Sequence, residues 1–505
     1  MPPQRDLTAR ARYYHGNQHS SEETNVTRAS QPEPGVPSPV GSPPSVGARL
    51  DRLRWSRLHT TILFALGAGW LFDSFEVQMF SSAVGPLGDH FGASQFARAA
   101  LLAVWLTGIL LGAPAGGRLT DRFGRRRLFV ITLLWYAGFT VATGLAPGLS
   151  FVYIFRFLAA LGVGAEYAIV NAAIAEFAPA RVRGKVNALV MNFWPAGAIL
   201  ASLLAYLLLD VLALSSASSW RYMFVLGGLI ALIVLYFRRR IPESPRWLAS
   251  RGRHAEAEAI VAALEQRAGA PAGGVRSEDA GPGLAEALRE LARRYAGRLA
   301  LGAVLDLAEA FGYYGLFALL SVVVLGRVHI GERAIPFFYL IGNAGALAGG
   351  VAMSSFFDRL GHRATVGLTY TASAVGVGLL AVATSAGSAA AVTAAFAVAS
   401  AAGTAAWTSA YPMFTELFPT HLRGAGVGFS VAVGRTGAIV GTLALPAIAT
   451  SLGPTWSYLL VAAFWLTGAA AVAIYAARGG MEPAGQPLEA VSVRQLAGAT
   501  AQGGR

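Results

Sequence analysis

The sequence places ionisable side chains inside long apolar stretches. They are Asp73, Glu76, Arg156, Glu166, Asp306, Glu309 and Arg435. Such a group costs several kcal/mol in an apolar span unless it faces a polar cavity or a charged partner. Asp73 and Glu76 lie three residues apart and share one helix face. Asp306 and Glu309 have the same spacing, with Tyr313 on their face, so we expect the two faces to meet across a polar chamber.

Buried carboxylates beside one another can exchange protons, because low dielectric and a neighbouring like charge both disfavour their ionised form. Proton coupling requires such groups. We therefore predict proton-coupling roles for Asp73, Glu76, Glu166, Asp306 and Glu309. The alternative is that some of these carboxylates form static ion pairs with arginine, and Glu166 could equally brace the helices.

Arg435 is the candidate anion-binding group. It lies eleven residues beyond Gly424, which is about 16 Å along a helix and near the middle of a bilayer. Its guanidinium stays charged and can hold a carboxylate through two hydrogen bonds. The alternative is an ion pair with Asp306 or Glu309 that only closes the chamber. Aromatic residues complete a pocket suited to a small aromatic carboxylate, namely Phe72, Phe75, Trp194, Tyr313, Tyr314 and Trp407.

The elements that must position these groups are membrane-spanning helices. The 505-residue chain is 54% hydrophobic and 13% charged, about half the charged fraction of a soluble protein. Apolar stretches long enough to cross a bilayer recur through the chain, and a soluble protein would lack the polar surface to cover them. The predicted spans are 58–86, 97–117, 128–146, 149–177, 185–210, 220–237, 299–325, 334–357, 364–384, 387–415, 425–449 and 455–477.

The net charge of +13 could suggest nucleic acid as a partner, but the arginines gather at alternate ends of the spans. That distribution follows the positive-inside rule and predicts cytoplasmic termini and a cytoplasmic central loop. The first 48 residues lack an apolar signal-peptide core. The chain has no cysteine, which excludes disulfides and Cys-ligated metals. Its eight histidines are scattered and without H-E-x-x-H, so we predict no metal site.

The chain divides into two similar halves. We predict a disordered tail at 1–48, a six-helix bundle at 49–237, a central loop at 238–298, a second bundle at 299–477 and a tail at 478–505. The loop contains the amphipathic segment Arg253–Gln266. Three sets of matching residues recur at offsets of 233, 237 and 240. A parallel duplication of six spans is the plan of a transporter whose halves rock about a central site.

The loop motifs resemble those of the major facilitator superfamily. Gly117–Arg126 reads GRLTDRFGRR and is similar to its G-x-x-x-D-R-x-G-R-R signature, and Pro242–Leu248 reads PESPRWL, as in sugar porters and metabolite–proton symporters. The resemblance covers about 58–477 and implies an all-α membrane protein with twelve transmembrane helices in two six-helix parallel repeats, the major facilitator fold. It also implies a proton-linked role for Arg156 and, as in organic ion transporters, an anion preference from Arg435. The implied gating residues are Gly117, Asp121, Arg122, Gly124, Arg125, Glu176, Arg183, Asp358, Arg359, Glu416 and Arg423.

Other function classes fit less well. The single lysine, Lys185, lacks the glycine spacing of a P-loop, which argues against an ATP-driven transporter. The sequence also lacks the pairing of a nucleophile with its base that would suggest an enzyme. We therefore expect a proton-coupled symporter of a small aromatic-type carboxylate, with no cofactor beyond the proton gradient. We expect it to work as a monomer in the plasma or inner membrane. A sugar porter, an organic-cation porter and an uncoupled facilitator stay open as alternatives.

Overall fold

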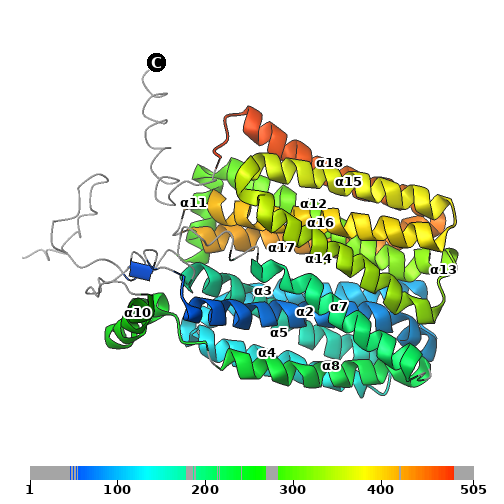
Figure 1. The fold of residues 1–505 in the computed structure, drawn as a ribbon, viewed down its shortest axis with the longest axis horizontal. Coiled ribbons are helices and arrows are strands. Elements are labelled where there is room, and N and C mark those ends of the chain that lie inside the picture. Colours follow the sequence, from blue (N-terminus) through cyan, green and yellow to red (C-terminus); the bar gives the residue numbers. More distant parts are fainter. Residues whose placement is uncertain are drawn as a thin grey trace, which may run out of the picture. The chain divides into compact units, whose positions relative to one another are not determined.

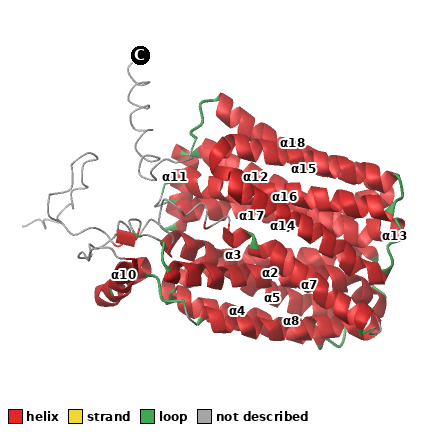
Figure 2. Ribbon diagram, viewed as in Figure 1, coloured by secondary structure: helices red, strands yellow, loops and turns green. Residues whose placement is uncertain are grey.

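A computed structural model describes most of the chain. The described residues are 46, 49–50, 53, 55–177, 186, 189–212, 214, 216–239, 241–268, 283–419 and 422–482. Within these ranges the fold is helical, and no strand occurs among the described residues (Figure 2).

Long helices follow one another through both halves of the chain (Figure 1). The N-terminal half comprises α2 (Arg57–His90), α3 (Gln95–Phe123), α4 (Arg125–Gly144), α5 (Leu149–Phe177), α7 (Phe193–Tyr206) with the π-helical turn η2 (Leu207–Val211), and α8 (Ser216–Arg238). The central loop carries α9 (Pro245–Ser250), α10 (His254–Ala268) and α11 (Leu284–Arg294). The C-terminal half comprises α12 (Ala296–Leu319), η3 (Leu320–Val324), α13 (Leu325–Arg327), η4 (Glu332–Ala334), α14 (Ile335–Leu360), α15 (His362–Ser385), α16 (Ala389–Leu417), α17 (Arg423–Ser451) and α18 (Pro454–Ala477).

Eleven helical segments of the described chain are long and apolar enough to cross a membrane. The predicted first span, α2, is not among them, although its 34 residues extend about 51 Å at 1.5 Å per residue. Asp73, Glu76 and Gln78 lie near the middle of α2 and lower its hydropathy. These polar groups explain why α2 falls short, and with α2 the described chain has twelve helices that can span a membrane.

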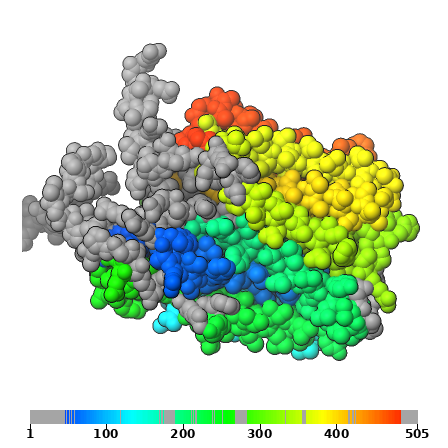
Figure 3. Space-filling model, viewed as in Figure 1, coloured from blue at the N-terminus to red at the C-terminus, as the bar shows by residue number. Residues whose placement is uncertain are grey.

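The helix pairings repeat between the two halves. In the N-terminal half α2 packs against α7 and α8, α3 against α5, and α4 against α5 and α8. In the C-terminal half α12 packs against α17 and α18, α14 against α16, and α15 against α16 and α18. The halves meet mainly where α17 contacts α3 and where α14 contacts α7. Figure 3 shows the same face with side chains, where the yellow-green surface of α14 adjoins the blue-green surface of the N-terminal half.

Glycines allow two equivalent helix pairs to approach closely. A Cβ at Gly112 of α3 would collide with the carbonyl oxygen of Leu161 in α5. In the C-terminal half, a Cβ at Gly349 of α14 would likewise collide with the carbonyl oxygen of Ala401 in α16. Close backbone approach through small residues is the usual way that membrane helices pack.

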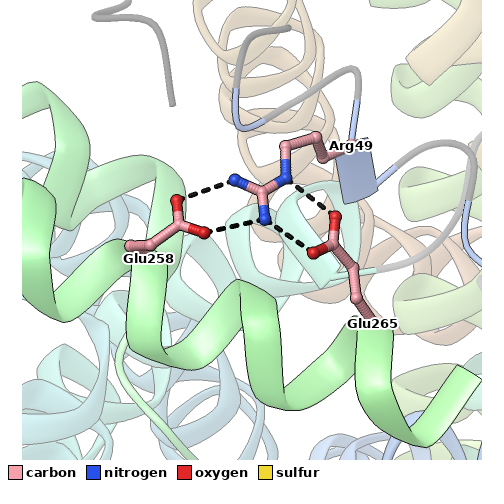
Figure 4. Close-up of polar contacts among 3 residues, drawn as sticks. All are labelled: Arg49, Glu258 and Glu265. Carbon is pink, nitrogen blue, oxygen red and sulfur yellow. Dashed lines mark hydrogen bonds and ion pairs between the residues drawn. The ribbon is translucent and has the colours of Figure 1, made fainter. Parts of the chain in front are cut away.

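The central loop is anchored to the segment that precedes α2. Arg49 donates hydrogen bonds to both oxygens of Glu258 at 2.7 and 2.9 Å and to both oxygens of Glu265 at 2.7 and 2.6 Å (Figure 4). Both acids lie on α10, which matches the predicted amphipathic helix. Val46 falls in the predicted tail, yet it is fully buried and packs with Val261 of α10 in a small apolar cluster.

Candidate functional site

Glu76 and Arg156 form a buried ion pair between α2 and α5. The Nη1 atom of Arg156 donates to Oε1 of Glu76 at 2.7 Å, and the Thr140 hydroxyl donates to the same oxygen at 2.5 Å. Both charged residues are completely inaccessible to solvent. The other carboxylate oxygen, Oε2, has no hydrogen-bond partner among the described residues. Hydrogen bonds thus hold the Oε1 atom of Glu76, while its Oε2 atom is available to a proton.

Three aromatic rings surround the guanidinium of Arg156. Its Cζ lies 5.0 Å from the ring centre of Phe80, 5.8 Å from Trp105 and 5.4 Å from Phe224. Rings at such distances stabilise a cation but provide no counter-charge. Glu76 therefore supplies the negative charge that this buried guanidinium needs.

A second ion pair lies in the same half, between Glu166 of α5 and Arg238 of α8. The guanidinium of Arg238 binds both oxygens of Glu166 and also donates to the carbonyl oxygen of Phe129 at 2.9 Å. Both charged side chains are buried. Asp73 is buried nearby and interacts electrostatically with Arg238 and Glu76. This geometry favours the bracing role considered for Glu166.

In the C-terminal half, Arg435 lies between two tyrosine rings. Its Cζ is 5.1 Å from the ring centre of Tyr167 and 5.2 Å from that of Tyr314. Its Nε atom is buried without a hydrogen-bond partner among the described residues. No direct ion pair joins Arg435 to Asp306 or Glu309 in the described part of the chain, although both acids are close enough to interact electrostatically. The guanidinium of Arg435 therefore forms no direct ion pair with a carboxylate of the described chain.

We expected the two pairs of carboxylates to face each other across a chamber, but in the structure they do not face each other directly. Glu76 turns into its own half toward Arg156. Asp306 lies against α17, where a Cβ at Gly434 would collide with its carboxylate. Tyr167 of the N-terminal half contacts Arg435 of the C-terminal half, because its ring centre lies 5.1 Å from the Arg435 Cζ atom. Each carboxylate pair therefore interacts with arginines of its own half.

An aromatic cluster joins the two halves beside Arg435. The Trp70 ring lies 4.5 Å from Tyr167, 5.6 Å from Trp194 and 5.8 Å from Trp407. The Trp194 indole also donates to the Tyr313 hydroxyl at 3.0 Å. We call Trp70, Tyr167, Trp194, Tyr313 and Trp407 the central aromatic cluster. It brings together Trp194, Tyr313 and Trp407, three of the predicted pocket residues.

Phe72 and Phe75 do not join the central aromatic cluster. Phe72 stacks on Phe75 at 5.8 Å and on Tyr136 of α4 at 5.5 Å. Both phenylalanines are buried within the N-terminal half. They face the opposite side of α2 from Trp70, so the structure gives no support for their predicted contact with a substrate.

The predicted gating loop is held by the carboxylate of Glu243, which is not among the predicted gating residues. Glu243 accepts a hydrogen bond from the backbone N–H of Arg125 at 2.8 Å, at the start of α4. Gly124 precedes it with φ of 89°, a conformation that favours glycine. Glu482 accepts from the N–H of His362 at 2.8 Å in the equivalent position of the C-terminal half. A carboxylate at a helix N-terminus is favoured by the unpaired amides and the helix dipole.

The other gating predictions are only partly visible. The Arg122 side chain is exposed and lies over the Phe123 ring, with its Cζ 5.3 Å from the ring centre. Most of the remaining residues lie, entirely or in their side chains, outside the described part of the chain: Gly117, Asp121, Glu176, Arg183, Asp358, Arg359, Glu416 and Arg423.

Three residues of the site, Arg238, Tyr167 and Trp70, are not predicted by the sequence pattern. The sequence places Arg238 at the start of the central loop, beside Arg239 and Arg240, but the structure buries it against Glu166. Tyr167 directly follows Glu166, and Trp70 lies one helical turn before Asp73. Only the closeness of Tyr167 and Trp70 to predicted residues points to a functional role. Aromatic residues are common in membrane helices, and the sequence does not show which way these two side chains point.

Comparison with known proteins agrees with this architecture. The family model for the sugar (and other) transporter family matches residues 60–493. The niacin transporter NiaP of Acinetobacter baylyi is 27% identical over 448 residues, which cover 88% of this chain and 99% of that protein. The "Probable 4-methylmuconolactone transporter" of Cupriavidus pinatubonensis is 29% identical over 385 residues, 75% of this chain and 82% of that protein.

Solved structures share the fold. The xylose transporter XylE from E. coli, in a partially occluded inward-open conformation, matches with a TM-score of 0.68 at 19% identity, covering 85% of this chain and 99% of that one. XylE is a member of the major facilitator superfamily. This chain therefore belongs to the sugar (and other) transporter family, and it shares the fold of the major facilitator superfamily member XylE. It is a multi-pass membrane protein that acts as a secondary transporter of a small molecule rather than as an enzyme.

Proposed function

We propose that this protein is a proton-coupled symporter of a small aromatic carboxylate, of the nicotinate or benzoate type. Arg435 binds the carboxylate, and the central aromatic cluster holds the ring. The Glu76–Arg156 pair carries the coupled proton.

The observation that carries the substrate assignment is the position of Arg435. Its guanidinium lies between Tyr167 of one half and Tyr314 of the other, and no carboxylate of the described chain forms an ion pair with it. A buried guanidinium without a direct counter-charge is well suited to a bound carboxylate, which it can hold with two hydrogen bonds. The nearby indole and phenol rings match an aromatic ligand better than a polyol.

The names of two relatives are consistent with this substrate class. One relative is named as a niacin transporter and another as a transporter of 4-methylmuconolactone. Both names describe small organic molecules, and niacin is an aromatic carboxylic acid. The resemblance to the xylose transporter concerns the fold only.

The proton is assigned to Glu76 because only one of its oxygens is engaged. A proton on Oε2 would displace no hydrogen bond and would remove the counter-charge of Arg156. Leaving a buried charge unpaired is costly. Proton binding therefore favours conformations in which Arg156 has another partner over the conformation in which it pairs with Glu76. Such a shift between conformations is what coupling requires.

The substrate assignment is tested by uptake into proteoliposomes with an inward pH gradient. Nicotinate and benzoate should accumulate, while nicotinamide, xylose and choline should not. Arg435→Gln should lower carboxylate uptake by about 30-fold or more, as expected for removing one partner of a buried charged contact. Arg327→Gln is the matched control, because that arginine is exposed and donates only to the carbonyl oxygen of Ala449.

Several outcomes would contradict the assignment. Unchanged carboxylate uptake by Arg435→Gln would exclude Arg435 as the anion-binding group. Accumulation of xylose or choline in place of nicotinate would favour a sugar or organic-cation porter.

Proton coupling is tested separately with Glu76→Gln. This variant should lose accumulation driven by the pH gradient but keep exchange of external for internal substrate, because the binding site is unchanged. Gradient-driven accumulation at the wild-type level would indicate an uncoupled role for Glu76. Loss of both activities would point to a structural role.

The proposal extends to topology and energy supply. Both termini and the central loop face the cytoplasm, in accordance with the arginines at those ends of the spans. The protein works as a monomer, and the proton gradient is its only energy source, with no bound cofactor.

A further inference from the structure

A groove lies between the start of α12 and the end of α18, away from the central site. Its volume is about 750 Å³, and α11 and the segment after α18 complete its walls. The helix α11, the start of α12 and the end of α18 lie at the same end of the helices (Figure 1). No step of the proposed transport uses this groove.

Three arginines line the groove. They are Arg294 of α11, Arg298 of α12 and Arg478 after α18. Arg298 and Arg478 form no ion pair within the described chain, and Arg294 has only a distant pair with Glu290 at 3.6 Å. Arg298 is held in place because it donates to the carbonyl oxygen of Leu417 at 3.0 Å and lies over the Tyr295 ring. The groove therefore concentrates positive charge that the described protein does not neutralise.

The opposite part of the groove is apolar and open to the membrane. Val304, Ala471 and Ile474 line it, one to two helical turns from the arginines. Ile474 is 52% exposed on a membrane-spanning helix, so it faces lipid. The groove thus combines a basic end with an apolar wall that continues into the hydrocarbon.

We propose that this groove binds an anionic phospholipid, with the phosphate at the arginines and an acyl chain along the apolar wall. Basic pockets between membrane helices at the cytoplasmic side recognise anionic headgroups in this way. Tyr295 and Tyr475 also line the groove, and tyrosine favours the membrane interface. A soluble phosphate would gain nothing from the apolar wall.

The test is lipid binding to the full-length protein, measured by native mass spectrometry with phosphatidylglycerol and phosphatidylcholine. The wild type should bind phosphatidylglycerol in preference. Arg294→Gln with Arg478→Gln should weaken phosphatidylglycerol binding by about 25-fold, roughly fivefold for each arginine near the surface, and leave phosphatidylcholine binding unchanged. Both arginines are exposed, so the variant should fold, and size-exclusion chromatography checks this.

The matched control removes two exposed arginines at the same end of the molecule, Arg127→Gln with Arg239→Gln. It should bind phosphatidylglycerol like the wild type. Equal weakening in the control would show a diffuse charge effect and overturn the site. Unchanged binding by the groove variant would overturn it as well. Binding of glycerol phosphate as tightly as the lipid would show a soluble anion site instead.

Discussion

At the scale of single residues, three buried arginines of the candidate site differ in what surrounds their charge. Arg238 binds both oxygens of Glu166 and a backbone carbonyl, so its charge is satisfied in place. Arg156 has one carboxylate oxygen and three aromatic rings. Arg435 has rings and electrostatic neighbours but no direct counter-ion in the described chain. These surroundings suit a brace, a switch and a ligand-binding group respectively.

The bracing role of Arg238 predicts a stability effect. Arg238→Met should destabilise the protein by about 3–5 kcal/mol, because Glu166 is left as an unpaired buried charge. Combining it with Glu166→Gln should recover most of that loss. Thermal unfolding in detergent measures both variants, with the exposed neighbour Arg239→Gln as a control that should change little. Equal destabilisation by the single and double variants would exclude the pair as a brace.

At the scale of helices, two equivalent pairs depend on close backbone contact. The α14–α16 contact at Gly349 has no space for a side chain, whereas a Cβ at Gly378 of α15 would meet nothing within 4 Å. The same substitution at these two glycines therefore distinguishes the effect of overpacking on stability from the effect of helix propensity.

Gly349→Val should destabilise the protein by about 1–3 kcal/mol or prevent folding, because overpacking forces the helices apart. Gly378→Val changes helix propensity by the same amount, and it should leave the yield of monodisperse protein near the wild-type level. Fluorescence-detected size exclusion and thermal unfolding measure both. Similar losses in the two variants would show that the close contact is not limiting.

The loop helix α10 has its own attachment through Arg49. Hydrogen bonds with Glu265 and Glu258 raise the pKa of the Arg49 guanidinium above its ordinary value, so it is charged at all physiological pH values. Arg49→Gln should release α10 and speed amide exchange there by about tenfold or more, because hydrogen bonds to charged groups contribute about 1.5–3 kcal/mol. Hydrogen–deuterium exchange measures this. Arg253→Gln, which removes an exposed pair with Glu256 and a contact with the Trp247 ring, should have little effect, and equal exchange in the two variants would argue against the attachment.

At the scale of the whole molecule, the two halves are equal in fold but not in charge. Helices α5 and α16 both contain 29 residues and start 240 residues apart, at Leu149 and Ala389. Arg156 of α5 therefore corresponds to Phe396 of α16, which stacks on Phe338 at 4.7 Å. The Glu76–Arg156 and Glu166–Arg238 ion pairs both lie in the N-terminal half, and the candidate anion-binding arginine lies in the other.

Movement of one half against the other can be tested at the end of the molecule away from the central loop. Thr450 of α17 donates to Gln95 of α3 at 3.4 Å, across the two halves. The native chain has no cysteine, so Gln95→Cys with Thr450→Cys introduces the only pair. A short reducible bifunctional crosslinker should abolish transport, and reductant should restore it. Transport that continues after complete crosslinking would show that this contact does not open, and either single cysteine serves as a control.

The sequence by itself determined the helical membrane architecture, the duplication and the residues that had to be buried. The reason is that apolar length, charge at span ends and repeated motifs are local properties of the chain. Only the tertiary structure decided which buried charges meet. Helix rotation directs Trp70 to the central aromatic cluster and Phe72 away from it, and it turns Glu76 toward Arg156 and not toward Asp306. Pairing between spans depends on packing across both halves, which no single stretch of sequence encodes.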